Sequence, residues 1–382
     1  KPEEMAILIS NKGFIKRVSV HLYRSQGRGG KGSNSANLLE EDFVEQLFVA
    51  NTHDHLLFIT SEGKAYWLKV HEIPESSRQA RGAHIKSLLA ISPNKEITTV
   101  IDFKHFSGSQ YLLMGTLKGV VKKVALSAFV NAKTRGIIAI HLDEGDRLVS
   151  ACLTGGKDEV MLITRKGQAL RINESQVRAM GRASRGVRGI RLSDDDELAT
   201  MLRVNDAEDM ALITINGYGK RVAYDAFNAH GRGTGGQMIY VPDDVSGEIV
   251  GAVSISEEDE AMLITSQGKT IKIQVSSVRV MGKGARGVRV VNIDPPDFVI
   301  GLDKIVRDEV EAAASAAAEA AAAAAAEAEN GEGAVSVDLA AAARALGQTG
   351  GLGRSSEPAE SEESDENDDA DERENGPDGD DE

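Results

Sequence analysis

The chain repeats one short pattern six times, at intervals of about fifty residues. Each copy has an apolar run, a polar turn that ends in glycine, and then alternating polar and apolar residues. The turn glycines, spaced by 50, 56, 48, 50 and 51 residues, are Gly13, Gly63, Gly119, Gly167, Gly217 and Gly268. A second mark follows each of them after about eighteen residues: Lys31-Gly32, Arg81-Gly82, Arg135-Gly136, Arg185-Gly186, Gly235-Gly236 and Arg286-Gly287. A period of this size predicts an array of similar structural units.

The residues after each turn glycine alternate in polarity, as in 64–70 and 270–275. This period is that of a half-buried β-strand, and the polar turn before it joins two strands into a hairpin. A unit of about four short strands cannot bury the faces of its own sheet, which favours a closed radial array. An open β-solenoid is the alternative, although its repeats are usually shorter. We therefore predict an all-β fold of six four-stranded blades around one centre, over residues 5–307.

One stretch combines glycine with cations more densely than any other. It consists of Gln26, Gly27, Arg28, Gly29, Gly30, Lys31 and Gly32. Glycine lets backbone N–H groups approach a ligand closely, and the arginine and lysine supply charge that attracts phosphate. A solvated turn with incidental charge is the alternative interpretation. We predict that this box contacts a nucleic-acid backbone.

Further basic residues recur at matching places in successive units, which merely solvating charges need not do. Equivalent positions in a disc of blades fall at equivalent places around its rim, so we expect a belt of cations suited to a bent phosphate backbone. Solvent-exposed strand charges are the alternative. The residues assigned to this belt are Lys64, Lys69, Arg78, Arg81, Lys122, Lys123, Arg135, Arg171, Arg178, Arg182, Arg185, Arg188, Lys220, Arg221, Arg232, Lys272 and Arg286. No recognition helix is apparent, so base-specific reading is not expected.

The charge of the chain is divided unevenly. Residues 1–307 carry 41 basic and 36 acidic residues, whereas residues 308–382 carry 3 basic and 23 acidic ones. The composition predicts an alanine-rich helical linker over 308–349 and a disordered acidic tail over 350–382, after a β-domain over 1–307. A mildly basic body with an acidic tail is expected of a polyanion binder that carries its own competitor.

The sequence offers no recognisable catalytic site. It lacks a phosphate-loop motif and a nucleophile elbow, and its single cysteine excludes a disulfide framework and fits a reducing cytoplasm. His53 and His55 have no third metal ligand at a suitable spacing, so we interpret them as loop residues. We expect no catalytic residue, metal or cofactor in this chain. It has no signal peptide or membrane-spanning run and begins without methionine, which suggests a piece of a longer protein.

The box and the repeats together resemble the C-terminal domain of the DNA gyrase A subunit. Residues 5–307 are similar to that family in the box, in Glu40–Phe43, in Val49–His55 and in Gly186–Leu192. Gly27 departs from the family, which commonly has arginine there. The resemblance implies a β-pinwheel, a six-bladed propeller relative whose blades exchange strands. It also implies that the domain binds and bends duplex DNA around its rim, so that the ATP-driven enzyme can introduce negative supercoils.

The resemblance further implies partners and a location. These are double-stranded DNA and the remainder of the A subunit together with the B subunit, in a heterotetramer, with ATP, Mg²⁺ and the cleavage tyrosine in other domains. The isolated domain is expected to be monomeric, and the enzyme to act on the bacterial chromosome in the cytoplasm. The equivalent domain of topoisomerase IV, whose box is absent or degenerate, is the near alternative. A protein-binding propeller is the other, and only DNA binding should weaken steeply with salt.

Overall fold

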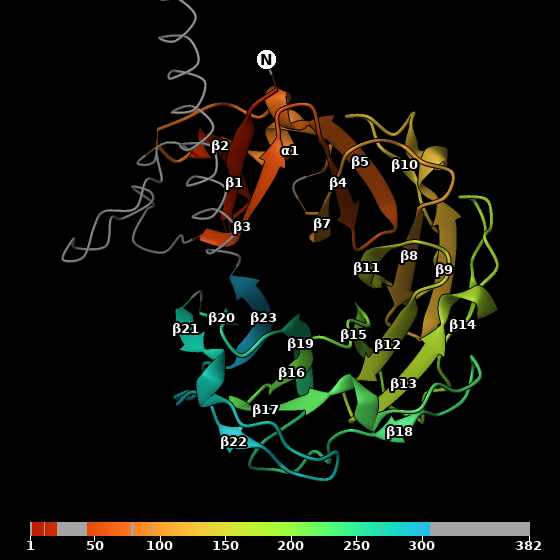
Figure 1. Cartoon of the computed structure of the whole chain (residues 1–382), viewed down its shortest axis with the longest axis vertical. Helices are drawn as coiled ribbons and strands as arrows, with labels where there is room; N and C mark the ends of the chain where they lie inside the picture. The colour runs from red at the N-terminus through yellow and green to blue at the C-terminus, as the bar shows by residue number, and fades with distance from the viewer. Residues whose placement is uncertain are drawn as a thin grey trace, which may run out of the picture. The chain divides into compact units, whose positions relative to one another are not determined.

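A computed structural model describes residues 2–305 except 11, 21–43, 78–79, 93 and 268. Within these ranges the chain forms six small antiparallel sheets and almost no α-helix, as the repeat predicts (Figure 1). We number the six sheets as blades 1 to 6 in chain order. None of the helices in the described ranges is long or apolar enough to span a membrane.

Each blade begins with a hairpin at a turn glycine, and a third strand then pairs with the first. From the innermost strand outward, the blades are β3 (Val44–Asn51), β1 (Glu4–Ser10), β2 (Phe14–Ser19) and β6 (Ala83–His84); β7 (Ile97–Phe103), β4 (His55–Thr60), β5 (Lys64–Lys69) and β10 (Ile137–Ile138); β11 (Leu148–Thr154), β8 (Tyr111–Thr116), β9 (Val120–Ala125) and β14 (Val187–Arg188); β15 (Leu198–Arg203), β12 (Glu159–Thr164), β13 (Gln168–Asn173) and β18 (Gln237–Met238); β19 (Ile249–Ile255), β16 (Asp209–Thr214), β17 (Tyr218–Ala223) and β22 (Val288–Arg289); and β23 (Val299–Ile305), β20 (Glu260–Thr265) and β21 (Thr270–Gln274).

The outermost strand of a blade comes from the following unit. Strand β10, for example, follows β9 of blade 3 in the chain but pairs with β5 of blade 2, where Ile137 lies opposite Ala65. The same exchange brings β6 to blade 1, β14 to blade 3, β18 to blade 4 and β22 to blade 5. This exchange confirms the pinwheel arrangement. Blade 6 has three strands among the described residues rather than the predicted four, and the second mark of the first unit, Lys31-Gly32, lies outside those residues.

Short helical turns connect the outer strand of each hairpin to the exchanged segment or follow it. The helical segments are η2 (Val70–Glu72), α1 (Ile85–Leu88), η3 (Leu126–Phe129), η4 (Glu174–Gln176), η5 (Tyr224–Ala226) and η6 (Val275–Ser277). The exchanged segment passes over the neighbouring blade at the second repeated glycine. At Gly186, whose φ is +93°, a Cβ atom would lie 2.6 Å from the carbonyl oxygen of Val121. Only glycine allows that approach, which explains why the second mark recurs.

The core lies between blades. Leu57 and Ile59 of blade 2 pack with Met114 and Phe129 of unit 3, and equivalent clusters fill the other gaps. The second half of each central strand is therefore buried on both faces, as in β12, where five consecutive residues are buried. Neighbouring innermost strands contact each other from β7 through β11, β15 and β19 to β23, and β23 contacts β3 of blade 1. Burial on both faces has a consequence for the predicted cations.

Candidate nucleic-acid interface

The box of residues 26–32 and Arg78 lie outside the described residues. The other predicted rim cations fall into two groups in the structure. One group is on the outer hairpin strand of each blade, mostly at the third and fourth residues after the turn glycine. The other is on the segment that is exchanged onto the neighbouring blade.

The first group is largely buried, which corrects the expectation of a solvent-facing belt. Lys122, Lys123, Lys220 and Arg221 are 0%, 5%, 0% and 4% exposed, and the side chain of Arg171 is 11% exposed. These strands lie between two blades and beneath an exchanged segment, so both of their faces are covered. In this group Lys64 and Lys272 are exposed and Lys69 is half-buried, and Lys272 forms an ion pair with Glu260. The buried members cannot contact a phosphate directly in this conformation.

The cations at the fourth position link neighbouring blades. Lys123 Nζ donates to the carbonyl oxygen of Glu174 at 2.9 Å. Arg171 and Arg221 donate in the same way to Tyr224 at 2.9 Å and Val278 at 2.6 Å. Each accepting carbonyl lies in or next to the short helical turn of the next unit. These side chains hold one blade to the next.

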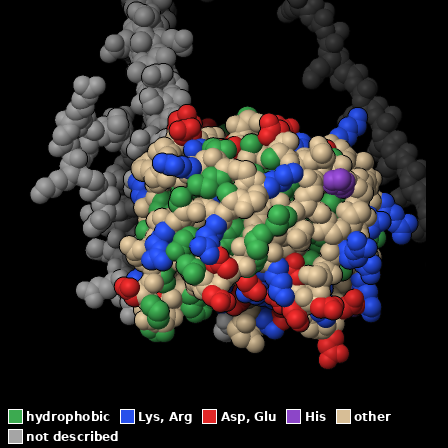
Figure 2. Space-filling view, turned by 90° about the horizontal axis from the view of Figure 1, so that it is seen from below, with side chains coloured by type: hydrophobic (Ala, Val, Ile, Leu, Met, Phe, Trp, Pro, Cys, Tyr) green, Lys and Arg blue, Asp and Glu red, His purple; other side chains and the backbone are tan. Residues whose placement is uncertain are grey.

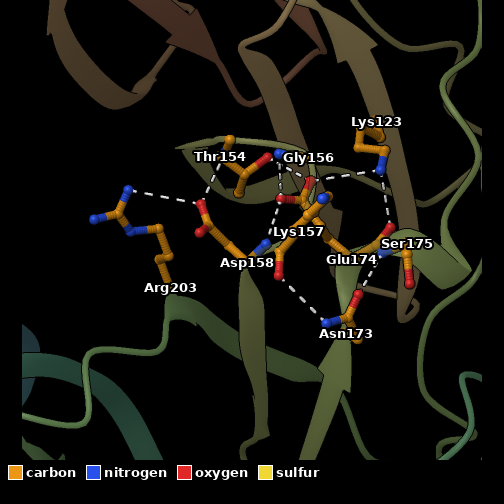
Figure 3. A network of polar contacts seen from close by, with 10 residues as sticks. Lys123, Thr154, Gly156, Lys157, Asp158, Asn173, Glu174, Ser175 and Arg203 are labelled. Carbon is orange, nitrogen blue, oxygen red and sulfur yellow. Dashed lines mark hydrogen bonds and ion pairs between the residues drawn. The ribbon is translucent and has the colours of Figure 1, made fainter.

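The Glu174 carboxylate is the centre of the most buried of these links (Figure 3). It accepts hydrogen bonds from Thr154 Oγ1 at 2.7 Å and from the backbone N–H groups of Gly156 and Asp158 at 2.7 and 2.9 Å. Lys123 Nζ lies 3.5 Å from the same carboxylate. A buried charge is tolerated when it is paired and hydrogen-bonded in this way.

The second group faces solvent or is half-buried. On blade 3, Arg178, Arg185 and Arg188 are exposed and Arg182 is half-buried. Arg185 pairs with Asp143 at 2.8 Å, whereas Arg178 has no ion pair within the described ranges. On blade 5, Arg286 is exposed and pairs with Asp243. Arg135 of blade 2 is exposed, and Arg81 and Arg232 are half-buried.

Two exposed arginines of blade 5 were left out of the predicted belt, although they repeat the positions of assigned residues. Arg279 and Arg289 correspond to Arg178 and Arg188, each 101 residues earlier in the chain. Arg289 donates to Tyr218 Oη at 2.8 Å and is exposed. Figure 2 shows one side of the molecule, on which basic side chains are interspersed with apolar ones and acidic side chains gather toward one edge. The repeat itself was the signal that could have found both arginines.

The histidine pair does not form a metal site in the described part of the chain. His55 stacks on Phe103 and contacts Trp67 and Phe106 edge-on, and its Nδ1 lies 3.1 Å from the carbonyl oxygen of Lys104. Burial lowers the pKa of His55 below its usual range. Among the described residues no group of three or more potential metal ligands is present. His55 is part of an aromatic cluster.

A strand-exchanged, six-bladed β-propeller with arginine-bearing segments on its outer strands is the class that this fold and surface define. The chain belongs to the DNA gyrase C-terminal domain, beta-propeller family, which consists of domains of type IIA topoisomerases. The family matches residues 4–51, 54–90, 110–151, 158–205, 208–256 and 259–305, one match for each blade. The resemblance seen in the sequence is thereby confirmed.

Relatives in several bacteria are A subunits of DNA gyrase. The chain is 62% identical over 305 residues to the one from Treponema pallidum, covering 80% of this chain and 38% of the relative. It is 35% identical over 303 residues to the one from Escherichia coli, covering 79% of this chain and 35% of the relative. The chain thus spans between a third and two fifths of the length of these relatives.

Two solved structures are similar. A DNA gyrase A C-terminal domain has 30% identity and a TM-score of 0.64, covering 80% of this chain and all of that chain. A C-terminal domain of DNA topoisomerase IV has 26% identity and a TM-score of 0.72, covering 84% of this chain and 98% of that chain.

Proposed function

We propose that this domain binds duplex DNA along its rim and bends it, and that it does so as the non-catalytic wrapping domain of a DNA gyrase. In that enzyme, DNA cleavage and ATP hydrolysis belong to other parts of the assembly. The wrapped DNA is presented for strand passage with a fixed handedness, so that ATP hydrolysis introduces negative supercoils.

The observation that carries this proposal is the set of exposed arginines on exchanged segments. Arg178, Arg185 and Arg188 on blade 3 recur as Arg279, Arg286 and Arg289 on blade 5. Guanidinium groups bind phosphate oxygens in a fixed, often bidentate geometry, and they do not lose their charge at physiological pH. Cations at repeated places around a ring can follow a curved phosphate backbone without reading its bases.

The box extends the same surface in this proposal. Gln26, Arg28 and Lys31 would contact DNA at one point of the ring, close to the backbone because of the glycines between them. The partners of the domain would be the remainder of the gyrase A subunit together with the B subunit, in a heterotetramer that uses ATP and Mg²⁺ on the bacterial chromosome in the cytoplasm. The domain by itself would be monomeric.

The topoisomerase IV similarity gives a second candidate, because that structure has the higher TM-score of the two. The two candidates differ in outcome. A gyrase domain wraps DNA and supports negative supercoiling, whereas the alternative predicts DNA binding without a change in linking number. The intact glycine-rich box favours the first candidate.

The experiment uses this fragment and relaxed closed-circular DNA. The two are mixed, a nicking-closing topoisomerase relaxes the unconstrained DNA, and the DNA is then deproteinised and separated on a gel. Wrapping is expected to leave a change in linking number that grows with protein and disappears at high salt, because phosphate contacts are salt-sensitive. Binding without any change in linking number would contradict wrapping. Absence of salt-sensitive binding would contradict the DNA-binding function itself and favour a protein-binding propeller.

A further inference from the structure

The third residue after the turn glycine alternates around the ring. It is lysine in blades 1, 3 and 5, at Lys16, Lys122 and Lys220. In blades 2, 4 and 6 it is Tyr66, Leu170 and Ile271. The structure buries Lys122 and Lys220 completely, so their charges are not part of the molecular surface.

Both buried ammonium groups are surrounded by backbone carbonyl oxygens. Lys122 Nζ donates to Ala139 at 2.8 Å, to Ser184 at 2.9 Å and also to Arg182. Lys220 Nζ donates to Gly282, Lys283 and Ala285 at 3.0, 2.8 and 2.8 Å. Neither ammonium forms an ion pair with a carboxylate of the described residues. Each has three N–H donors and three accepting oxygens, so its hydrogen-bonding capacity is filled.

Most of these oxygens belong to one exchanged segment in each case. The segment over Lys122 ends in β14, and the segment over Lys220 ends in β22. At the end of each, glycine brings the backbone against the strand below: a Cβ at Gly287 would lie 2.5 Å from the carbonyl oxygen of Gly219. The carbonyl groups therefore turn inward toward lysine, and side chains such as Arg185 and Arg286 remain exposed.

The segments held by a buried lysine in blades 3 and 5 are also the richest in cations. Residues 178–188 contain four arginines, and residues 279–289 contain three arginines and one lysine. The corresponding segments over Lys16, Tyr66 and Leu170 are residues 74–84, 128–138 and 228–238, which contain two, two and one lysines or arginines. A lysine that only filled space would not need to occur beneath both segments that carry the most surface charge.

We propose that Lys122 and Lys220 are positioning residues for DNA binding. Each fixes a cation-bearing segment by its carbonyl groups, so that the arginines are held ready for phosphate before DNA arrives. This proposal rests on the DNA-binding function proposed above. It assigns blades 3 and 5 as preorganised phosphate contacts, and preorganisation strengthens binding because less freedom is lost on association.

The test compares Lys122→Met and Lys220→Met with Lys118→Met in this fragment. Lys118 is exposed, lies on the same hairpin as Lys122 and carries the same charge, so its substitution matches the change in net charge. DNA affinity is measured over a range of salt concentrations. We expect lower affinity for the two buried substitutions, with a salt slope that falls by about 0.9 for each phosphate contact released. The Lys118 variant is expected to keep the slope of the unaltered fragment.

A double-mutant cycle separates positioning from a loss of folded protein. Arg182→Gln with Arg185→Gln is made with and without Lys122→Met. If Lys122 acts through these arginines, their substitution has a smaller effect on affinity when Lys122 is already replaced. Additive effects, or an affinity and slope equal to those of the Lys118 variant, would overturn the proposal while DNA binding by the unaltered fragment stands. An unaltered fragment that binds no DNA would remove the proposed function as well.

A measurement on the unaltered fragment covers the case in which Lys122→Met fails to fold. Acetic anhydride acetylates exposed amines, and mass spectrometry gives the rate at each lysine. Lys122 and Lys220 are expected to react at least about tenfold more slowly than Lys118, since reaction requires the segment above them to open. Equal rates at the three lysines would show that the segments are not held, and the proposal would then be wrong.

Discussion

Among single residues, charges that look alike in the sequence have different structural roles. Glu174 is completely buried and accepts hydrogen bonds from three groups as well as facing Lys123, as Figure 3 shows. Glu197 is half-exposed and pairs with Arg165 at 2.8 Å. Desolvation separates these two glutamates, because removing a partner from a buried ion leaves a charge that water cannot reach.

We predict that Glu174→Gln lowers the free energy of unfolding by about 3 to 5 kcal/mol, as expected when one partner of a buried ion pair is removed. The amide nitrogen cannot accept the hydrogen bonds that the carboxylate accepts, and Lys123 remains buried. Glu197→Gln is the control and should change the free energy by about 0 to 1 kcal/mol. Urea unfolding followed by circular dichroism measures both. Equal effects of the two substitutions would contradict this account of Glu174.

Asp297 gives a pH-dependent prediction. Burial alone would raise the pKa of its carboxyl, but hydrogen bonds from Ser266, Gln267 and Phe298 hold the pKa at about 2. Because the folded-state pKa lies below the ordinary value of 3.8, the carboxylate stabilises the fold above about pH 4 and this contribution is lost toward pH 2. The stability difference between the unaltered domain and Asp297→Asn should therefore shrink between about pH 4 and pH 2 in urea titrations. A difference that stays constant with pH would exclude this role.

Among the elements, the exchanged strand depends on a close approach of two backbones. Gly186 has a φ of +93°, and a Cβ there would lie 2.6 Å from the carbonyl oxygen of Val121. Gly181, in the same segment, has no atom within 4 Å of a Cβ position. The two glycines therefore differ in whether a side chain has room.

Gly186→Ala is expected to be destabilising by more than about 2 kcal/mol, from the left-handed backbone together with the collision. The segment must move off the strand beneath it, which should also free Lys122. Gly181→Ala is the matched control and should have little effect on the melting temperature. Calorimetry of the two variants makes the comparison, and similar melting temperatures would mean that the crossing tolerates a side chain.

Across the complete chain, the distribution of charge suggests two functions that lie outside the described residues. The box at 26–32 concentrates glycine and cations, and residues 308–382 carry a net charge of −20 against +5 for residues 1–307. Both regions would act on the same DNA-binding surface, one in its favour and one against it.

Replacing Gln26, Arg28 and Lys31 by alanine should remove wrapping but leave measurable DNA affinity, because the exposed arginines of blades 3 and 5 remain. In an enzyme reassembled with its other parts, negative supercoiling is expected to be lost while relaxation or decatenation is retained. Gel assays of both activities on the same preparation provide the internal control. Normal supercoiling by the substituted enzyme would show that the box is only a turn.

Truncation after Arg307 should tighten DNA binding at low salt. A tethered acidic segment can compete with DNA at an effective concentration on the order of mM, although each exposed ion pair contributes only about 0 to 1 kcal/mol. The gain must therefore come from many charges together and should shrink as salt rises. Binding isotherms of the full and truncated fragments at several salt concentrations measure it. Equal affinities at low salt would leave the acidic segment without a role in DNA binding.

The number of blades, the place of each hairpin and the family could all be predicted from the order of the residues. Turn glycines with positive φ and alternating strands are local requirements, which each unit must meet in its own residues. The exposure of the cations could not be predicted, because it depends on packing between units. Alternation says which residues share a face of a strand, but in a ring of blades both faces are covered by neighbours. Lys122 is therefore buried and Arg185 exposed, because a segment from the next unit covers the first and carries the second.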